Sequence, residues 1–404
     1  MADDYENEAV EEEEIAAPVV VAEDDDDGRS KMNVFWNSGM LAHNAGEGVF
    51  DTLYDPGFLA VLDNHPENPE RIINIVSILK KGPIAPYIRW HDGVPAELEQ
   101  LTSFHSPAYI RDLLDANKAG GKVLCEGTQL NPGSWKAALL AAGTTMTAMQ
   151  YVVEGHGKLA YALVRPPGHH AQPTQADGYC FLNNAGVAVQ LAIDSGVKKI
   201  AVVDIDVHYG NGTAEGFYDR DDVFTISLHM PHGSWGDSHP QSGLPDEVGK
   251  GAGIGYNLNI PLPNGTGDKG YEYALRELVI PALAHFKPEI LVVTFGQDAS
   301  VLDPNGRQCI TAEGYRTLGR ILAEEADKHA DGRLLLVQEG GYHVTYSAYC
   351  AHFMVEGLLK LPENLLDDLQ PSTLEDEEFI AAKVEEIKQT FTDAVAAAKK
   401  GVKT

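Results

Sequence analysis

Short apolar runs recur along the chain between longer segments with helical periodicity. After a first strand-like run at 32–36, the clearest of them predict strands at 158–165, 198–207, 222–229, 289–296 and 333–338. These runs are apolar almost throughout rather than at every second residue, which is typical of strands that are buried on both faces. The sequence therefore predicts an α/β fold in which helices cover both faces of a mainly parallel sheet.

Helical periodicity predicts helices at 69–81, 107–118, 135–154, 182–194, 269–286, 312–330 and 344–360. Two of these have clear start signals, because Asn68 and Ser106 can each cap a helix whose first residue is a proline. The segment 32–360 contains neither an internal repeat nor a linker, so we expect one folded domain at 31–365. An acidic, disordered tail is expected at 1–30, and a helical extension at 366–404 that packs on the domain or projects from it.

The charge of the chain bears on its partners. The formal net charge is −30, and residues 1–27 contain 13 acidic residues and no basic one. An acidic protein repels phosphate backbones, so we expect no direct binding of nucleic acid. No run of about 18 apolar residues is present, so no membrane-spanning segment is expected either.

Cysteine usage and the N-terminal sequence indicate a reducing compartment. The four cysteines are scattered without a CxxC pair, which argues against both a disulfide framework and a cysteine-based zinc site. The N-terminus lacks the basic-then-apolar order of a secretory signal. No basic cluster reads as a nuclear signal, so we expect the cytoplasm, with the nucleus as a second location.

The apolar run at 198–207 ends in a pattern of polar residues at every second position. Asp204, Asp206 and His208 would share one face of the strand because side chains alternate across it. Two carboxylates and an imidazole on a buried strand are costly unless something compensates them. The pattern therefore predicts a metal ion.

Three further polar clusters each follow a predicted strand. His169 and His170 come after 158–165, Asp298 after 289–296, and Tyr342 after 333–338. In a parallel sheet the carboxyl ends of the strands meet at one edge, so these residues should lie together.

Asp206, His208 and Asp298 would supply three ligands and leave a position open for water, as in catalytic zinc sites. One of the paired histidines could accept the proton of that water, and Tyr342 could donate a hydrogen bond to the developing oxyanion. Such an assembly hydrolyses an amide.

Five motifs, "RPPGHHA", "GYCFLNNAGVA", "DIDVHYGNGT", "ISLH" and "EGGY", resemble those of the zinc-dependent histone deacetylases, a family with the arginase–deacetylase fold. The resemblance extends over 34–360 and implies a single domain with about eight strands, so that 31–365 would be the catalytic domain. The segment 246–268 is more similar to the class II and acetylpolyamine-amidohydrolase branch than to class I. The stretch "GQDASVLDPNGRQ" resembles a plant class II member.

The resemblance implies a role for each matching residue. Asp206, His208 and Asp298 match the zinc ligands, and His170 matches the general base and acid. His169 matches an electrostatic helper, and Tyr342 the tyrosine that polarises the carbonyl. Asp204 matches the carboxylate that orients His169, and Asn211 the partner of His170.

The expected substrate tunnel departs from the family pattern at several positions. Its residues would be Gly178, Tyr179, Trp235, Asn305 and Gly340, with Tyr179 standing where the family usually has a phenylalanine. Asn305 matches a gatekeeper position that is a glutamate in polyamine-selective relatives, so this residue does not support a polyamine preference.

Two further positions differ from the family as well. Gln297 replaces a phenylalanine before the third ligand. Pro107 replaces an aspartate that clamps peptide backbones in class I, and it can equally be read as the first residue of a helix.

The resemblance also implies potassium as a second cofactor beside one Zn²⁺. One site would involve Asp204, Asp206, His208, Ser227 and Leu228, and a weaker one Phe217, Arg220, Val223 and Tyr256.

The expected reaction is hydrolysis of an N-acetyl amide with release of acetate. The first expected substrate is acetyl-lysine in proteins such as histones or tubulin, which would make the protein a chromatin regulator; small acetylated amines or polyamines are the alternative. Two other classes remain open. One is a two-metal ureohydrolase, which Gln297 and Ala299 beside Asp298 disfavour, and the other is a non-catalytic scaffold. The sequence does not predict an oligomeric state.

Overall fold

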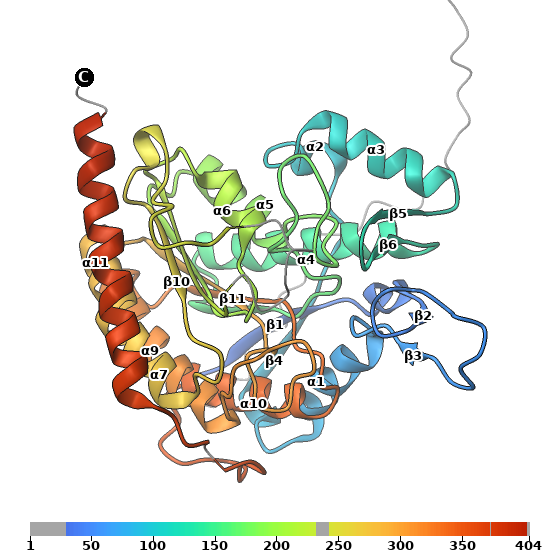
Figure 1. Ribbon diagram of the computed structural model, residues 1–404. Coiled ribbons are helices and arrows are strands. Elements are labelled where there is room, and N and C mark those ends of the chain that lie inside the picture. Colours follow the sequence, from blue (N-terminus) through green and yellow to red (C-terminus); the bar gives the residue numbers. More distant parts are fainter. Residues whose placement is uncertain (1–29, 232–241, 372, 402–404) are drawn as a thin grey trace, which may run out of the picture.

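The computed structural model describes residues 30–231, 242–371 and 373–401, so the tail predicted at 1–30 lies almost entirely outside the described residues. At the centre is one sheet of eight parallel strands in the order β10-β9-β8-β11-β12-β7-β1-β4 (Figure 1). The strands are β1 (Met32–Trp36), β4 (Ile88–Asp92), β7 (Leu159–Ala162), β8 (Ile200–Asp204), β9 (Val223–His229), β10 (Asn257–Pro261), β11 (Ile290–Phe295) and β12 (Leu334–Gln338). The predicted single-domain α/β fold with a parallel sheet is confirmed.

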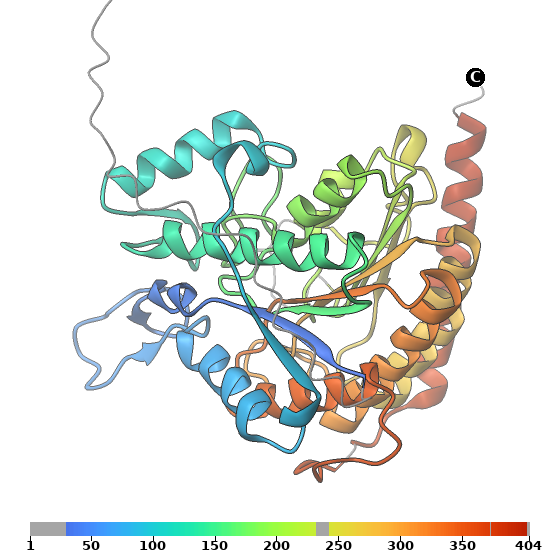
Figure 2. The same ribbon diagram turned by 180° about the vertical axis from the view of Figure 1, so that it is seen from behind.

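Helices cover both faces of the sheet, as Figures 1 and 2 show from opposite sides. One face is covered by α1 (Pro69–Lys81), α7 (Asp268–Ala274), α8 (Ile280–Phe286), α9 (Ala312–His329) and α10 (Tyr346–Leu358). The other is covered by α2 (Leu98–Leu101), α3 (Pro107–Lys118), α4 (Ser134–Val153), α5 (Asn184–Asp194) and α6 (Asn211–Phe217). Asn68 and Ser106 cap α1 and α3 as predicted, each with a proline at the start of the helix.

The two faces of each central strand belong to two separate hydrophobic cores. In β8, Val203 packs with the α1 and α7–α10 side, whereas Val202 packs with the α2–α6 side. The same division holds for Val293 and Val292 in β11. Because helices cover both faces of the sheet, the side chains on both faces are buried, and polar residues at alternate positions would not reach solvent. This explains the unbroken apolar runs of the sequence.

The two outer strands β4 and β10 were not among the strands predicted from the sequence. Both are edge strands with mixed sequences, "IRWHD" and "NLNIP", which lack a continuous apolar run. In β10 the buried side chains of Asn257 and Asn259 donate hydrogen bonds to the backbone carbonyls of Glu247 (2.6 Å) and Leu244 (3.1 Å). These bonds allow polar residues inside an edge strand.

The helix predicted at 269–286 is not one regular helix. A π-helical turn at Leu275–Val279 separates α7 from α8, which has Pro281 in its first turn. Proline has no backbone N–H and its ring crowds the preceding turn, so a regular α-helix cannot continue through this position. The wider turn before Pro281 accommodates the ring.

The C-terminal helix α11 (Glu377–Gly401) packs along the domain rather than projecting from it (Figure 1). Its buried residues Ile380, Val384 and Ile387 join the core on the α7–α10 side. Lys388 forms an ion pair with Glu277 at 3.0 Å. No helix within the described part of the chain has the length and apolarity needed to cross a membrane.

Two small hairpins lie at the side of the molecule remote from α11 in both views (Figures 1 and 2). They are formed by β2 (Glu47–Gly48) with β3 (Asp63–Asn64), and by β5 (Lys122–Cys125) with β6 (Thr128–Leu130). The ring of His65 at the end of the first hairpin is 3.1 Å from the carbonyl oxygen of Gly127 in the second. The hairpins therefore support each other beside the carboxyl ends of the strands.

Candidate active site

The polar residues predicted to meet do lie together, at the carboxyl ends of the central strands. Asp204 is the last residue of β8, and Asp298 and Tyr342 lie in the loops after β11 and β12. His169 and His170 lie in the loop after β7, which neighbours β12. Adjacent parallel strands thus bring together residues that are far apart in the sequence.

The strand predicted at 198–207 ends earlier than expected, at Asp204. From Asp206 onward, the backbone N–H groups donate to side-chain oxygens instead of to the backbone carbonyls of a neighbouring strand. The backbone N–H of Asp206 donates to Oδ1 of Asp204 (3.0 Å), and that of His208 donates to Oδ1 of Asp206 (2.9 Å). Such local side-chain bonds compete with a regular strand. The predicted alternation nevertheless persists, because Ile205 and Val207 both pack in the same core as Val203.

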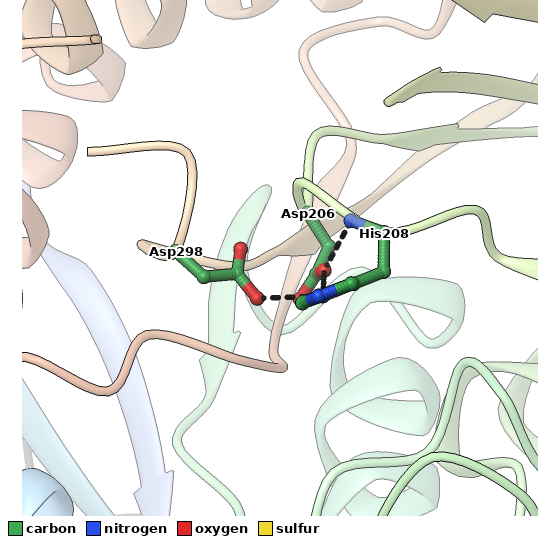
Figure 3. A group of neighbouring side chains, drawn as sticks. All are labelled: Asp206, His208 and Asp298. Atoms are coloured by element: carbon green, nitrogen blue, oxygen red, sulfur yellow. Dashed lines mark hydrogen bonds and ion pairs between the residues drawn. The ribbon is translucent and has the colours of Figure 1, made fainter. Parts of the chain in front are cut away.

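Asp206, His208 and Asp298 form a compact group of potential metal ligands (Figure 3). Nδ1 of His208 is 3.1 Å from Oδ1 of Asp206 and 3.1 Å from Oδ2 of Asp298. One ligand atom from each of the three residues lies within 4.8 Å of the others. Both carboxylates are fully buried, and His208 is partly exposed.

The electrostatics of this group favour a bound cation. Burial, together with the neighbouring carboxylate of Asp206, raises the pKa of Asp298 to about 7. The pKa of Asp206 is lowered despite burial, because His169 and His208 lie close to it. Within the described residues, neither carboxylate forms an ion pair with a lysine or arginine. Two buried carboxylates and an imidazole, left without a permanent positive charge, are a donor set suited to a divalent metal ion.

Gly340 lies against these carboxylates. Its backbone N–H donates to Oδ2 of Asp206 at 2.9 Å. A side chain at this position would start 2.2 Å from Oδ2 of Asp298, so only glycine fits without moving the ligand. The predicted substrate-binding residue Gly340 is therefore in contact with the ligand group.

The two histidines have different partners and opposite electrostatic environments. Nδ1 of His169 is 2.9 Å from Oδ2 of Asp204, and Nδ1 of His170 is 2.6 Å from Oδ1 of Asn211. The pKa of His169 is raised despite burial, because the carboxylates of Asp206 and Asp204 stabilise its charged form. Burial and the neighbouring imidazoles of His169 and His208 lower the pKa of His170. The geometry therefore suits a charged His169 and a neutral His170 that can accept a proton.

Both the backbone and the ring of Tyr342 contact neighbouring side chains. Its backbone N–H donates to Oδ2 of Asp303 at 2.6 Å, and the guanidinium of Arg71 lies 5.0 Å from the centre of its ring. Arg71 also donates from Nε to the carbonyl oxygen of Gly341 at 2.7 Å. Burial raises the pKa of the Tyr342 hydroxyl, which therefore remains a hydrogen-bond donor at neutral pH.

A pocket of about 580 Å³ leads from the surface to this group. Its lining includes His170, His208 and Tyr342 at the inner end, and Gly178, Tyr179 and Asn305 among the predicted tunnel residues. Gly178 has φ +49°, and a side chain there would start 2.3 Å from the ring of His170. Trp235, the predicted opposite wall, lies outside the described residues.

Two of the departures from the family pattern have structural roles. Pro107 is the exposed first residue of α3, whose Tyr109 and Asp112 line the pocket instead. Gln297 is fully buried and hydrogen-bonds to the side chain of Gln338, with Nε2 to Oε1 at 3.0 Å.

Some residues of the expected potassium sites contact one another, and the sites themselves stay a prediction. Asp204 and Ser227 are paired across β8 and β9. Arg220 lies over the ring of Phe217 and forms an ion pair with Asp222 at 2.6 Å. Tyr256 accepts a hydrogen bond from Thr225 through its backbone carbonyl at 3.1 Å.

Sequence reasoning missed a buried ionic network behind the site. Oε1 of Glu67 accepts hydrogen bonds from Arg71 and Arg165, both at 2.9 Å, and Oε2 lies 3.3 Å from Nε2 of His43. All four side chains are buried. Glu67 lies in "HPENPERI", where it resembles an ordinary residue before a helix, so only the pairing of distant segments reveals its role. The network fixes Arg71, and through it Tyr342.

Replacing Glu67 by glutamine should lower the free energy of unfolding by about 3–5 kcal/mol, because two buried guanidinium groups lose the one carboxylate that pairs with them among the described residues. Equilibrium urea denaturation of the purified protein measures this. Glu70→Gln, at an exposed position three residues further along the chain, is the matched control and should change stability by no more than about 0.5 kcal/mol. A loss for Glu67→Gln as small as that of the control would contradict the prediction.

Glu339 is a second residue that the sequence did not mark. It is fully buried, and its Oε2 accepts hydrogen bonds from the backbone N–H groups of Gly168 (2.7 Å) and His169 (3.1 Å). Burial raises its pKa to about 8. Its position at the end of β12 lets it fix the start of the loop that carries both histidines.

Comparison with known proteins gives consistent results. The histone deacetylase domain family matches residues 65–358. Histone deacetylase 8 of Arabidopsis thaliana is 60% identical over 368 residues, which cover 91% of this chain and 98% of that protein. The crystal structure of the HDA15 HD domain superposes with a TM-score of 0.76 at 29% identity, covering 92% of this chain and 99% of that one. The crystal structure of an acetylpolyamine aminohydrolase from Burkholderia pseudomallei superposes with a TM-score of 0.71 at 26% identity, covering 81% of this chain and 98% of that one.

Proposed function

Because the chain belongs to the histone deacetylase family, we propose that it hydrolyses the acetyl-lysine amide of protein substrates and releases acetate, using one zinc ion. Its relatives are named as deacetylases and amidohydrolases, and the chain is a hydrolase of C–N bonds other than peptide bonds. The observation that carries the proposal is the group of Asp206, His208 and Asp298, whose His208 lines a pocket together with His170 and Tyr342.

Asp206, His208 and Asp298 would hold the metal ion. When bound, a zinc ion polarises the amide carbonyl and makes water more acidic. The mixed nitrogen and oxygen donors favour zinc over the hard cations magnesium and calcium, which prefer oxygen alone.

The remaining groups would move protons and stabilise charge. His170, kept neutral by its surroundings, would accept the proton of the attacking water and return it to the amine that leaves. Asn211 accepts the Nδ1–H of His170, which leaves Nε2 as the base, and Asp204 holds the neighbouring His169. The Tyr342 hydroxyl would donate a hydrogen bond to the oxygen of the former carbonyl as negative charge develops on it.

Small acetylated amines are the second candidate substrate class. They are favoured by the similarity to an acetylpolyamine aminohydrolase from Burkholderia pseudomallei and to an acetylpolyamine amidohydrolase from Mycoplana ramosa. Histone deacetylase 8 of Arabidopsis thaliana matches nearly along its whole length and at higher identity, so acetyl-lysine in protein remains the first choice.

Steady-state kinetics of the zinc-loaded protein will separate these substrates. We expect hydrolysis of an acetyl-lysine peptide with a kcat/KM of at least about 10³–10⁴ M⁻¹s⁻¹, because the side chains proposed as ligands, base and oxyanion donor lie close together. An acetylated polyamine should be hydrolysed less efficiently. A preference for the polyamine by orders of magnitude would reverse the order of the two substrates, and failure with every acetylated amine tested would favour a non-catalytic scaffold.

The stoichiometry of the metal separates the proposal from the ureohydrolase alternative. Among the described residues, one group with metal-ligand spacing is found, so one tightly bound zinc per chain is expected. Two tightly bound manganese ions would favour the two-metal enzyme. The potassium sites and a location in the cytoplasm, with the nucleus as a second location, remain proposals from the sequence.

A further inference from the structure

The outer part of the active-site pocket is lined by acidic side chains. Asp51, Asp112, Glu126 and Asp177 contribute to its wall, and Lys122 is the one lysine or arginine among the described lining residues. An excess of carboxylates around a confined opening raises the local concentration of cations. Charge alone does not define a binding site, so the positions of these carboxylates matter.

Two of these carboxylates are held by hydrogen bonds: Asp177 accepts from Nδ2 of Asn211 at 3.0 Å, and Asp51 is fixed at the pocket wall by Tyr179. The hydroxyl of Tyr179 donates to Oδ2 of Asp51 at 2.6 Å, and the backbone N–H of Tyr179 donates to Oγ1 of Thr128 at 2.8 Å. Both Tyr179 and Phe50, which precedes Asp51, have positive φ angles, of 69° and 58°. Non-glycine residues rarely adopt this conformation, and where they do, the strain is commonly part of a functional site.

Asn305 provides a second, independent sign of a ligand. It lines the same pocket, its side chain is only 1% exposed, and its Nδ2 donates to the Tyr179 hydroxyl at 3.4 Å. Its Oδ1 has no hydrogen-bond partner in the described part of the chain. A buried acceptor without a partner is unfavourable, so a donor brought next to this oxygen would be stabilised.

We propose that Asp51, positioned by Tyr179 and assisted by Asn305, is a specificity residue that binds a positively charged nitrogen of the substrate near the acetylated amine. Both side chains offer acceptors, and both contact the same tyrosine hydroxyl, so a group with several N–H donors and a positive charge fits them best. The proposal rests on the proposed function and narrows its substrate class. The cation would be a basic residue beside acetyl-lysine in a peptide, or a second ammonium group in a small acetylated amine.

The alternative is that Asp51 only anchors the loop between β2 and β3 to Tyr179. The two roles differ in what they require of the side chain. Anchoring needs an acceptor for the tyrosine hydroxyl, which an asparagine still provides. Binding a cation needs the negative charge, which an asparagine lacks.

The test uses the full-length, zinc-loaded protein and two pairs of substrates matched in size. One pair is an acetyl-lysine peptide flanked by lysines and the same peptide flanked by glutamines. The other pair is an acetylated polyamine and a neutral N-acetylalkylamine of similar length. Asp51→Asn should lower kcat/KM for the cationic member about 5- to 30-fold, mostly through KM, and change the neutral member less than about twofold.

Two further variants complete the design. Asp55→Asn removes the same charge from the same loop, at an exposed position that does not line the pocket. It should leave kcat/KM unchanged for all four substrates. Tyr179→Phe keeps the ring but releases Asp51. It should therefore reduce the preference for cationic over neutral substrates, as Asp51→Asn should. If Asp51→Asn lowers kcat/KM for the cationic member of only one substrate pair, that pair identifies the source of the cation as a peptide or a small amine.

Several outcomes would overturn the inference. Equal losses for cationic and neutral substrates would show an anchoring role, and no loss for either would show that Asp51 has no part in recognition. If none of the four compounds is hydrolysed, the proposed function fails. The same compounds are then stable ligands, and calorimetric titration of the wild type and of Asp51→Asn tests the preference for a cation separately.

Discussion

Asp298→Ala should abolish both metal binding and turnover. At the proposed metal site, Asp298 is one of the three ligands found among the described residues, and its carboxylate also accepts the backbone N–H of Val207, between the other two ligands, at 2.9 Å. Metal catalysis contributes several kcal/mol, so kcat with an acetyl-lysine peptide should fall by about 10³-fold or more. Elemental analysis of the purified variant should find far less than one zinc per chain.

Thermal unfolding with and without added zinc distinguishes lost binding from lost folding. Zinc should raise the melting temperature of the wild type, because only the folded state brings the ligands together, and should have little effect on the variant. Asp367→Ala, which removes an exposed aspartate outside the pocket lining, serves as the control and should behave like the wild type. Full zinc occupancy together with full turnover in Asp298→Ala would refute the assignment of the metal site.

Tyr342→Phe should have the next largest effect. The substitution removes only the hydroxyl, and the phenyl ring can keep its contact with Arg71 (5.0 Å) and with the ring of Tyr179 (5.7 Å between centres). If the hydroxyl stabilises the developing oxyanion, kcat should fall by about 10²–10³-fold. KM and zinc content should change little, since the hydroxyl acts in the transition state and is not a metal ligand.

Tyr349→Phe, on helix α10, makes the same chemical change at a partly exposed position outside the pocket and should leave kcat unchanged. A loss in Tyr342→Phe that appears mainly in KM would assign the hydroxyl to ground-state binding instead. A kcat within about threefold of the wild type would remove Tyr342 from the chemistry altogether.

The sequence contained more information about the central strands than about the edges. β8, β11 and β12 are covered on both sides, and burial alone dictates their unbroken apolar character. β4 and β10 each have a neighbour on one side only, so polar residues such as Asn257 are tolerated and weaken the pattern. The break before Pro281 could have been anticipated, because a proline inside a helical pattern disturbs the turn that precedes it.

The residues of the site could be named because carboxylates and histidines at strand ends are conspicuous against an apolar background. The residues that support them could not. Glu67 is a single acid in an unremarkable local sequence, and Glu339 lies in the "EGGY" motif without a role that the motif reveals. Their roles arise from contacts with Arg165 and His169, about a hundred residues or more away in the chain. Asp51 likewise accepts its hydrogen bond from Tyr179, which lies 128 residues away in the chain. Local patterns reveal groups that are costly to bury, and only the tertiary structure reveals what stabilises them.

The strand order has a consequence for how the protein must be made. β7, β1 and β4 form one part of the sheet, β8, β9 and β10 form another, and β11 and β12 are inserted between them although they come last in the chain. During synthesis the two parts therefore remain separate, each with an unpaired inner edge, until residues 290–338 have left the ribosome. Asp298 comes just after β11, so the proposed metal site cannot be completed before this strand has been made. Until then the open strand edges need protection from aggregation.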